Sequence, residues 1–420
     1  MRREVSPVLV AASLLLLLLG VLVAYWRGLT PEPPVGRYAN PDELGKYSRP
    51  EGVSDETLAR QSPRQGTADF TVSTLAGSRD PGHADGPARV ARFDGPAAVA
   101  VDPDGTLYVA DSRNHAIRRI SPNGQVSTVA GGPVPGHFGG YADGPPRAAR
   151  FCAPAGVAVL PDGGVLVADT GNHRLRRIAR DGTVSTIAGS ATASDGLGQA
   201  LGGYRDGPAL QAQFRFPTGL AVDAEGVIYI ADTGNSRVRR LAKGVVTTVP
   251  TSEGGMRAPT AVLVASDSSL LASDSVGRGG EEAALWTRTG SGPLSHLHLA
   301  QTPLLEPTTL SHEETYSFGL RTPAGLAYTS RPGTPPRPSG RSTAFFFVDA
   351  SSHCLNWSGE LGDETRPPAV VAGEAGTPGY VDGPGDTARF RIPAGLAARP
   401  GGTLYVADFG NNCIRKVELR

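Results

Sequence analysis

Aspartates recur along this sequence at similar intervals, and evenly spaced carboxylates could form a ring of cation ligands. An Asp ends a short apolar run in six places, at 111, 169, 232, 274, 349 and 408. The letters that follow, such as "DTGN" and "DSRN", are typical of turns, in which Asp accepts backbone N–H bonds and Gly and Asn tolerate positive φ. We therefore interpret the following residues as turn formers of a repeat and not as metal ligands: Asp111, Asp169, Asp232, Asp349 and Asp408, with Asn114, Asn172 and Asn235.

Three histidines, His115, His173 and His353, stand four residues after these aspartates and could suggest a zinc site. Zinc binding would need three nitrogens within about 2.1 Å of one ion. Equivalent positions of separate repeats lie about a repeat's width apart, and the same place holds Ser236 or Asn412 elsewhere. We expect these histidines to be polar turn residues.

Comparison of the chain with itself shows four clear repeats, at 86–131, 144–189, 207–249 and 383–420. Each contains short β-type runs separated by Gly, Asp, Asn or Pro, which predicts four antiparallel strands joined by hairpin turns. In the second repeat we expect strands at 155–160, 165–169, 174–179 and 183–188. Two weaker copies begin at 257 and 321, so the repeats number six.

The sixth repeat ends at Arg420, directly after its third strand. The stretch "DFTVSTLAG" at 69–77 matches a fourth strand, but no repeat precedes it. A repeat sheet left alone exposes an apolar face and an unpaired edge. We therefore predict that the N-terminal strand completes the last sheet and closes the six repeats into a ring.

The second repeat, with "PAGVAV" followed by "GGVLVADTGNHRLRRI", resembles the NHL repeat. The resemblance covers about 67–420. It implies an all-β fold, a six-bladed β-propeller of NHL type whose last blade is closed by the N-terminal strand. Propellers host both enzymes and binding proteins, so the fold alone does not decide the function.

Catalytic propellers offer a comparison at the central axis. In amidating lyases that resemble NHL proteins, a His follows the Pro of the first strand in several blades and binds Zn²⁺. The matching residues here are Ala97, Ala155, Thr218, Thr260, Ala324 and Ala394. None of these can ligate zinc, and the Glu, Asn and Asp set of lactonase-like propellers is not found at these positions. The resemblance implies an axis lined by small side chains, with no catalytic residue, metal or cofactor.

Three further features recur in the clear repeats. The letters "DGP" contain Asp85, Asp143, Asp206 and Asp382, and predict a capped turn that enters a short helix. We expect the aromatic residues that follow to wedge between blades: Phe93, Phe151, Phe214 and Phe390. Basic pairs occur at 118–119, 176–177, 239–240 and 415–416. We expect one residue of each pair to pack its stem along a strand edge with its charged head in water.

The N-terminus predicts a membrane anchor. The run "VLVAASLLLLLLGVLVAYW" at 8–26 is uncharged and follows Arg2 and Arg3, which favours a transmembrane signal anchor with residues 1–7 in the cytoplasm. Residues 27–66 read as a Pro-rich stalk, and 67–420 as a propeller outside the cytoplasm. The alternative is a cleaved signal peptide, which would leave a secreted or periplasmic protein.

The charge and composition of the chain limit the classes of partner that it is expected to bind. The chain has 40 basic and 40 acidic residues, a balance that does not support a nucleic-acid partner. We favour a membrane-tethered, non-catalytic binding or scaffold module for a protein, peptide or cell-envelope glycan. The alternative is a propeller-type metal-dependent hydrolase or lyase with ligands supplied by loops. Loops around 296–313 and the Pro-rich insertion at 330–342 are candidates for a partner-specific sector.

Overall fold

The computed structural model of the chain describes residues 69–133, 139–191, 201–252, 254–265, 268–275, 284–288, 290, 292–297, 323–328, 344–360 and 369–419. The predicted N-terminal segment (1–7), anchor (8–26) and most of the stalk lie outside this part of the chain, and so remain predictions. Within the described residues, no helix combines the length and the apolar character needed to cross a membrane.

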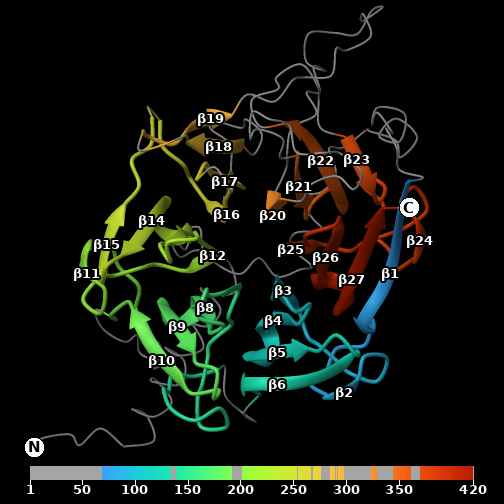
Figure 1. Cartoon of the computed structure of the whole chain (residues 1–420), viewed down its shortest axis with the longest axis horizontal. Helices are drawn as coiled ribbons and strands as arrows, with labels where there is room; N and C mark the ends of the chain where they lie inside the picture. The colour runs from blue at the N-terminus through green and yellow to red at the C-terminus, as the bar shows by residue number, and fades with distance from the viewer. Residues whose placement is uncertain are drawn as a thin grey trace, which may run out of the picture. The chain divides into compact units, whose positions relative to one another are not determined.

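The described residues form six antiparallel sheets around a central axis, which confirms the predicted six-bladed propeller (Figure 1). We number the sheets as blades 1 to 6 in chain order. Blade 1 contains β2 (Gly86–Pro87), β3 (Pro96–Val101), β4 (Leu107–Asp111), β5 (Ala116–Ile120) and β6 (Gln125–Gly131). Blade 2 contains β7 (Gly156–Val159), β8 (Val165–Asp169), β9 (Arg174–Ile178) and β10 (Val184–Ala188). Blade 3 contains β11 (Gly207–Pro208), β12 (Pro217–Val222), β13 (Ile228–Asp232), β14 (Arg237–Ala242) and β15 (Val245–Thr248).

The weaker repeats form sheets of the same kind. Blade 4 contains β16 (Pro259–Val264), β17 (Leu270–Asp274), β18 (Ala284–Arg288) and β19 (Ser295–Leu297). Blade 5 contains β20 (Pro323–Tyr328), β21 (Ala344–Asp349), β22 (Cys354–Glu360) and β23 (Ala369–Ala372). Blade 6 contains β24 (Gly383–Pro384), β25 (Pro393–Arg399), β26 (Thr403–Asp408), β27 (Cys413–Leu419) and β1 (Phe70–Gly77). Short 3-10 turns follow four second strands: η3 (Ser112–Asn114), η4 (Thr170–Asn172), η5 (Thr233–Asn235) and η6 (Phe409–Asn411).

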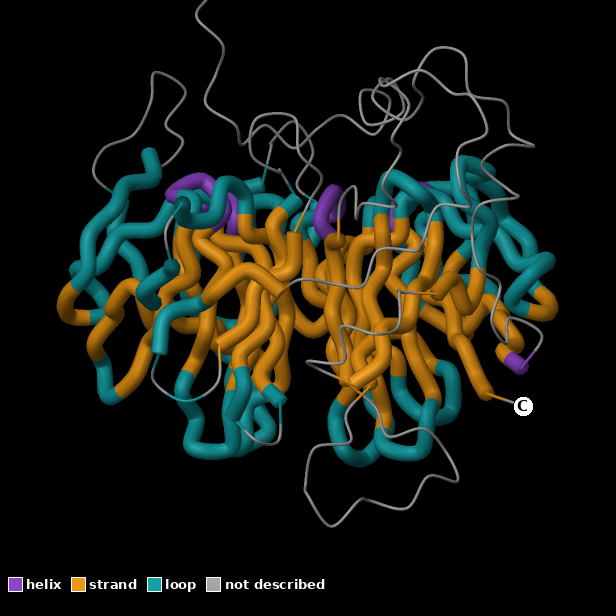
Figure 2. Tube along the Cα trace, turned by 90° about the horizontal axis from the view of Figure 1, so that it is seen from above, coloured by secondary structure: helices purple, strands orange, loops and turns teal. Residues whose placement is uncertain are grey.

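The strand pattern read from the sequence holds closely in blade 2, where each predicted strand boundary lies within one residue of the observed one. The second strands are the most deeply placed, because neighbouring strands cover both of their edges and neighbouring blades cover their faces. All five residues of β8 are buried, in keeping with its nearly continuous apolar run. Figure 2 shows the strands crossing the thickness of the propeller, with loops gathered at its two faces.

The ring is closed by the N-terminal strand, as predicted. β1 pairs antiparallel with β27, with Val72 opposite Val417 and Gly77 opposite Cys413. On its other side β1 pairs with the short strand β24. Blade 6 therefore takes three long strands from the end of the chain and its fourth from the beginning, which removes the unpaired edge of β27.

The first strands of the blades form the inner wall of the ring. They contact one another in the order β3, β7, β12, β16, β20, β25 and back to β3. Four of these contacts bring backbones very close beside a glycine that follows the small axial residue. An added Cβ at these glycines would lie 3.0 Å or less from backbone atoms of the next blade: Gly156, Gly219, Gly325 and Gly395.

Apolar side chains fill the spaces between neighbouring blades in six clusters. The cluster between blades 6 and 1, for example, joins Ala76 and Ile414 to Val109. Four of the clusters contain a fully buried aromatic residue that follows a "DGP" segment: Phe93, Phe151, Phe214 and Phe390. The core of the propeller is therefore distributed over its blade interfaces.

Gly395 tests the close packing at the axis. A Cβ there would lie 2.6 Å from Cα of Ala98 and 2.8 Å from the carbonyl oxygen of Ala97. Because backbone must move to make room, we expect Gly395→Ala to lower the free energy of unfolding by about 1–3 kcal/mol, measured by chemical denaturation of the full-length protein. Blade 1 carries Ala98 at the equivalent place, and Ala98→Gly is expected to cost at most about 1 kcal/mol. Equal losses would contradict the packing argument.

Candidate functional site

A buried arginine lies on the third strand of each clear repeat: Arg118 on β5, Arg176 on β9, Arg239 on β14 and Arg415 on β27. All four side chains are 0% exposed. The expectation that one residue of each basic pair keeps its charged head in water fits the second residue of the pair, which is partly or fully exposed, and the first residue is buried instead. A buried guanidinium is tolerated only where charges and hydrogen-bond acceptors surround it.

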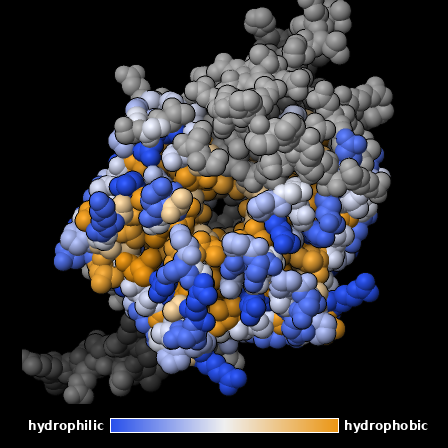
Figure 3. Space-filling model, in the orientation of Figure 1, coloured by the Kyte–Doolittle hydropathy of each residue, from blue (hydrophilic) through white to orange (hydrophobic). Residues whose placement is uncertain are grey.

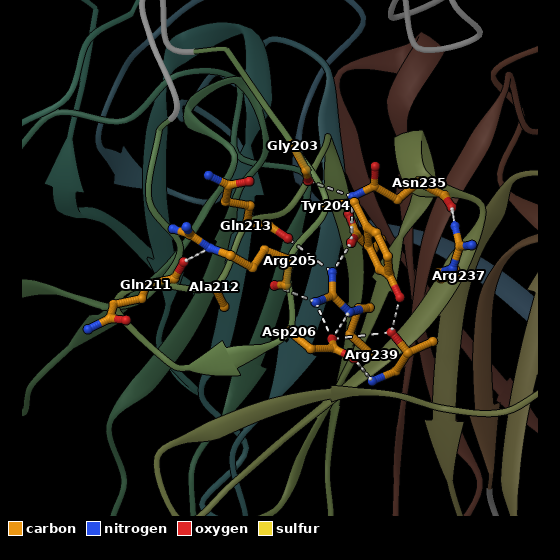
Figure 4. A network of polar contacts seen from close by, with 12 residues as sticks. Gly203, Tyr204, Arg205, Asp206, Gln211, Ala212, Gln213, Asn235, Arg237 and Arg239 are labelled. Carbon is orange, nitrogen blue, oxygen red and sulfur yellow. Dashed lines mark hydrogen bonds and ion pairs between the residues drawn. The ribbon is translucent and has the colours of Figure 1, made fainter.

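Blade 3 shows how the guanidinium is held (Figure 4). Nη1 of Arg239 donates to Oδ2 of Asp232 at 2.6 Å and to the carbonyl of Gln213 at 3.0 Å. Nη2 donates to Oδ1 of Asp206 at 2.5 Å and to the carbonyl of Arg205 at 2.9 Å. Nε also donates to Asp206, at 3.1 Å. Two carboxylates and two carbonyls thus engage all three nitrogens of the guanidinium.

Aromatic rings complete the surroundings of the buried guanidinium. The carbon Cζ of Arg239 lies 4.9 Å from the ring centre of Tyr204 and 5.2 Å from that of Phe214. The hydroxyl of Tyr204 shares a 2.9 Å hydrogen bond with Thr248 on the fourth strand. The inter-blade phenylalanines therefore also provide cation–π contacts, which occur in all four of these blades.

The aspartates that end the second strands accept both turn hydrogen bonds and the buried ion pair. Oδ1 of Asp232 accepts from the N–H of Arg215 at 2.7 Å, and Oδ2 accepts from Asn235 at 2.9 Å as well as from Arg239. Burial raises the pKa of this carboxyl to about 6, against the opposing effect of its hydrogen bonds and Arg239. The same applies to three equivalents: Asp111, Asp169 and Asp408.

In blades 4 and 5 the equivalent aspartates accept from backbone N–H groups. Asp274 accepts from Arg257 and Ala258, and Asp349 from Ser351 and Ser352. The sequence analysis identified the turn but missed the arginine. A signal was present, because in each clear repeat the Arg follows the Asp by seven residues.

The expected short helix after "DGP" is wrong. Gly86–Pro87, Gly207–Pro208 and Gly383–Pro384 are instead two-residue strands that pair with the fourth strands of their blades. The preceding Asp does not cap a helix. Asp206 accepts from the N–H of Thr248 at 3.0 Å and binds Arg239, so it ties the outer edge of the blade to its buried cation.

The histidines connect neighbouring blades. His115, His173 and His353 have positive φ of 52, 56 and 61°. Their Nδ1 atoms accept from the backbone N–H groups of Ala153, Phe216 and Ile392 at 2.9, 3.0 and 3.1 Å. In blade 6, Oδ1 of Asn412 accepts from Gly95 in the same way, at 2.9 Å. Among the described residues, no group of three or more His, Cys, Asp or Glu side chains is placed to hold a metal ion.

The predicted axial residues lie at the inner wall. Ala97, Thr218, Thr260 and Ala394 belong to first strands, and Ala155 directly precedes β7. These five are partly exposed, and nothing is described for the side chain of Ala324. The hydroxyl of Thr218 donates to the carbonyl of Thr260 at 3.0 Å, which links blades 3 and 4.

Two surface features stand apart from the internal network. One is a hollow of about 370 Å³ beside the turns that follow the first strands of blades 1, 2 and 3. The other is the outer edge of blade 3, where Leu210 and Val245 are 61% and 44% exposed. Figure 3 shows one face of the molecule, with a hollow at its centre and apolar surface on the left, on the side of β11 and β15.

Comparison with known families matches two models. The model described as the teneurin NHL domain matches residues 123–242, and the NHL repeat model matches 93–120 and 390–417. Teneurin-4 of Mus musculus is 32% identical over 209 residues, which is 45% of this chain and 7% of that protein. NHL repeat-containing protein 2 of Bos taurus is 31% identical over 146 residues, 34% of this chain and 19% of that protein. The chain thus matches only a small part of these relatives.

Solved structures show the same fold. An auxiliary nutrient binding protein from Bacteroides thetaiotaomicron superposes with a TM-score of 0.57 at 16% identity, over 83% of this chain and 76% of that one. A protein of unknown function from the same organism superposes with a TM-score of 0.55 at 19% identity, over the same shares. At these identities the likeness concerns the fold alone.

Substitution of the buried arginine tests the internal network. Lys keeps the positive charge but replaces a planar fork of five donors by a single point. We expect Arg239→Lys to lower the free energy of unfolding by about 3 kcal/mol, because it leaves buried acceptors unpaired. The matched control is Arg240→Lys on the adjacent, partly exposed residue, with an expected change within about 0.5 kcal/mol. Equal effects in chemical denaturation would contradict this account.

The histidine contacts predict a pH dependence. Burial lowers the pKa of His115 and of His353, and an imidazole that accepts at Nδ1 must be neutral there. The unfolded chain binds protons near pH 6.5 that the native imidazoles resist, so stability is lost as pH falls below about 6.5. Asn412 shows that an amide oxygen can make the same contact. We expect a variant with Asn at 115, 173 and 353 to lose less stability between pH 7.5 and 5.5 than the wild type does.

The comparison isolates the imidazoles, because the buried aspartates titrate in both proteins. His115→Ala removes the acceptor and is expected to cost about 1 kcal/mol at pH 7.5, since the N–H of Ala153 loses its partner, and less at pH 5.5, where the wild type has itself lost stability through this imidazole. A wild type and an Asn variant with the same pH slope would refute the role of the neutral imidazoles.

Proposed function

Since the chain belongs to the NHL-repeat β-propellers, we propose that it is a non-catalytic binding or scaffold module for a protein, peptide or cell-envelope glycan. In this proposal the apolar segment at 8–26 anchors the chain in a membrane, and the propeller lies outside the cytoplasm. The balanced charge of the chain agrees with a partner other than nucleic acid.

The proposal rests on one observation: the polar side chains that recur in the repeats are engaged in contacts inside the propeller. Acids, imidazoles and guanidinium groups are the side chains that general acid–base or metal chemistry would need. In the clear repeats, Asp232 and Arg239 are saturated by each other and by backbone groups, and the histidines hold the next blade. These side chains support a rigid frame, and partner recognition is then a property of the surface.

The outer edge of blade 3 supports a surface role. Pro208 of β11 pairs with Val245, and Leu210 follows in the next turn, so both apolar side chains belong to one edge. The positions equivalent to Leu210 and Val245 are polar in the neighbouring clear repeats, with Arg89 and Gln125 in blade 1 and Arg147 and Thr183 in blade 2, although blade 1 exposes Val90 at the next position of its turn. An exposed apolar pair where sister repeats are polar is typical of a contact surface. The sector favoured by the sequence, 296–313 and 330–342, lies outside the described residues except at the end of β19.

The proposal is tested by giving blade 3 the residues of blade 1. The double variant Leu210→Arg with Val245→Gln should fold, because blade 1 carries these residues in the same strand context. Affinity purification with cross-linking, using the full-length protein, should recover about fivefold less partner, the effect of losing roughly 1 kcal/mol of interface energy. The control is the reverse exchange in blade 1, Arg89→Leu with Gln125→Val, which should leave recovery unchanged. A purified protein that binds no partner but holds a stoichiometric metal needed for hydrolysis would contradict the proposal.

A further inference from the structure

The hollow beside blades 1 to 3 is built from equivalent pieces of three consecutive repeats. The ends of the first strands contribute Val101, Val159 and Val222. The next residue of each repeat is Asp102, Leu160 or Asp223. One wall is therefore aliphatic, and carboxylates stand on both sides of Leu160. Pro103, Pro161, Gly163 and Arg180 complete the lining.

The two carboxylates retain capacity for a ligand. The carboxylate of Asp102 accepts no hydrogen bond from the described residues. Only the backbone of Asp102 is used: its N–H donates to the carbonyl of Thr106, and its carbonyl accepts from the N–H of Gly105, both at 2.8 Å. Asp223 uses Oδ1 to accept from the N–H of Val227 at 2.7 Å, and no hydrogen bond within the described residues occupies its Oδ2. Both residues are partly buried. A partly desolvated carboxylate with a free oxygen attracts a cation more strongly than a fully solvated one does.

Among the described residues, Arg180 is the one cation that lines the hollow, and it is held at the blade 2 side. Its Nε donates to the carbonyl of Asp162 at 2.7 Å, and its guanidinium lies over Gly163. The carboxylate of Asp162 is bound instead to Arg177, at 2.5 Å. Arg399, the equivalent of Asp102 in blade 6, lies beside the blade 1 turn, with its guanidinium next to Gly105. The lining therefore has two negative charges and one positive charge.

We propose that this hollow binds a cationic nitrogen carried on an aliphatic stem, either a free alkylammonium compound or a lysine side chain of a peptide. The nitrogen pairs with Asp102 on the blade 1 side of the hollow or with Asp223 on the blade 3 side, and Val101, Val159, Leu160 and Val222 contact the stem. The charges of the lining favour a cationic ligand over an anionic one. The aliphatic wall favours a cation that carries an aliphatic stem over a small hydrated ion. As a site for a lysine of a partner, it would extend the proposed function. As a site for a free amine, it is independent of that function.

The probe is n-pentylammonium, with n-pentanol as its neutral analogue, titrated into full-length protein with labelled Val and Leu methyl groups. We expect the ammonium compound to shift the methyl resonances of Val101, Val159, Leu160 and Val222, and pentanol to shift them less. Asp102→Asn and Asp223→Asn should each weaken binding by about two- to fivefold, the scale of a partly exposed ion pair. Asn at 223 keeps the acceptor for Val227, so the turn is preserved.

Two further variants separate this site from general charge effects. Arg180→Gln removes a like charge and should tighten binding. Glu225→Gln makes the same charge change as Asp223→Asn, but on the exposed part of the blade 3 turn, and should leave binding unchanged. Acetyl-Gly-Lys-Gly-amide distinguishes the sources, because a lysine site binds it and a site for free amines excludes it. Equal binding of pentanol, or no effect of Asp102→Asn, would overturn the proposal. Loss of partner recovery in the blade 3 edge variant alone would concern only the proposed function.

Discussion

The last blade has three long strands from the end of the chain, so the ring can close only where β1 pairs with β27. That pairing joins residues more than 300 positions apart, and the contact between blades 6 and 1 depends on it. Without it, the apolar cluster around Phe93 and Ile414 would lose one wall, and the first strands could not form a continuous inner ring. Closure is costly in chain entropy, and it is offset by burial on both sides of the joint.

Within this ring, the same polar cluster is built four times. Each copy places a guanidinium between two carboxylates, under an aromatic ring and beside backbone carbonyls, and each histidine or asparagine at the following corner reaches the next blade. Burying so many charges is tolerable only because each guanidinium is paired with carboxylates, even where its Nε has no partner among the described residues, as in Arg118 and Arg415. The consequence for function is that the four clear repeats share one interior, and the differences between these blades lie at the surface, as at Leu210, Leu160 and Asp102.

The sequence analysis predicted the repeat number, the strand order and the closing strand, because strand period, turn residues and repeat length are local signals. It could not predict the partners of side chains that meet across the blade. Arg239 and Asp206 are 33 residues apart, and their contact depends on how the "DGP" segment folds back on the fourth strand. A short strand there, in place of the expected helix, explains why this contact was not predicted. The glycine after the small axial residue is part of the repeat motif and is visible in the sequence. Its reason, a close contact with the backbone of the next blade, is seen only in the structure.

Hydrogen exchange measured on the backbone amides of β1 tests ring closure most directly. In a closed ring these amides exchange as slowly as those of β6 and β10, the fourth strands that blades 1 and 2 take from their own repeats. If the amides of β1 exchange at the rate of an unfolded chain while β6 and β10 remain protected, the N-terminal strand does not complete blade 6, and the closed propeller is wrong.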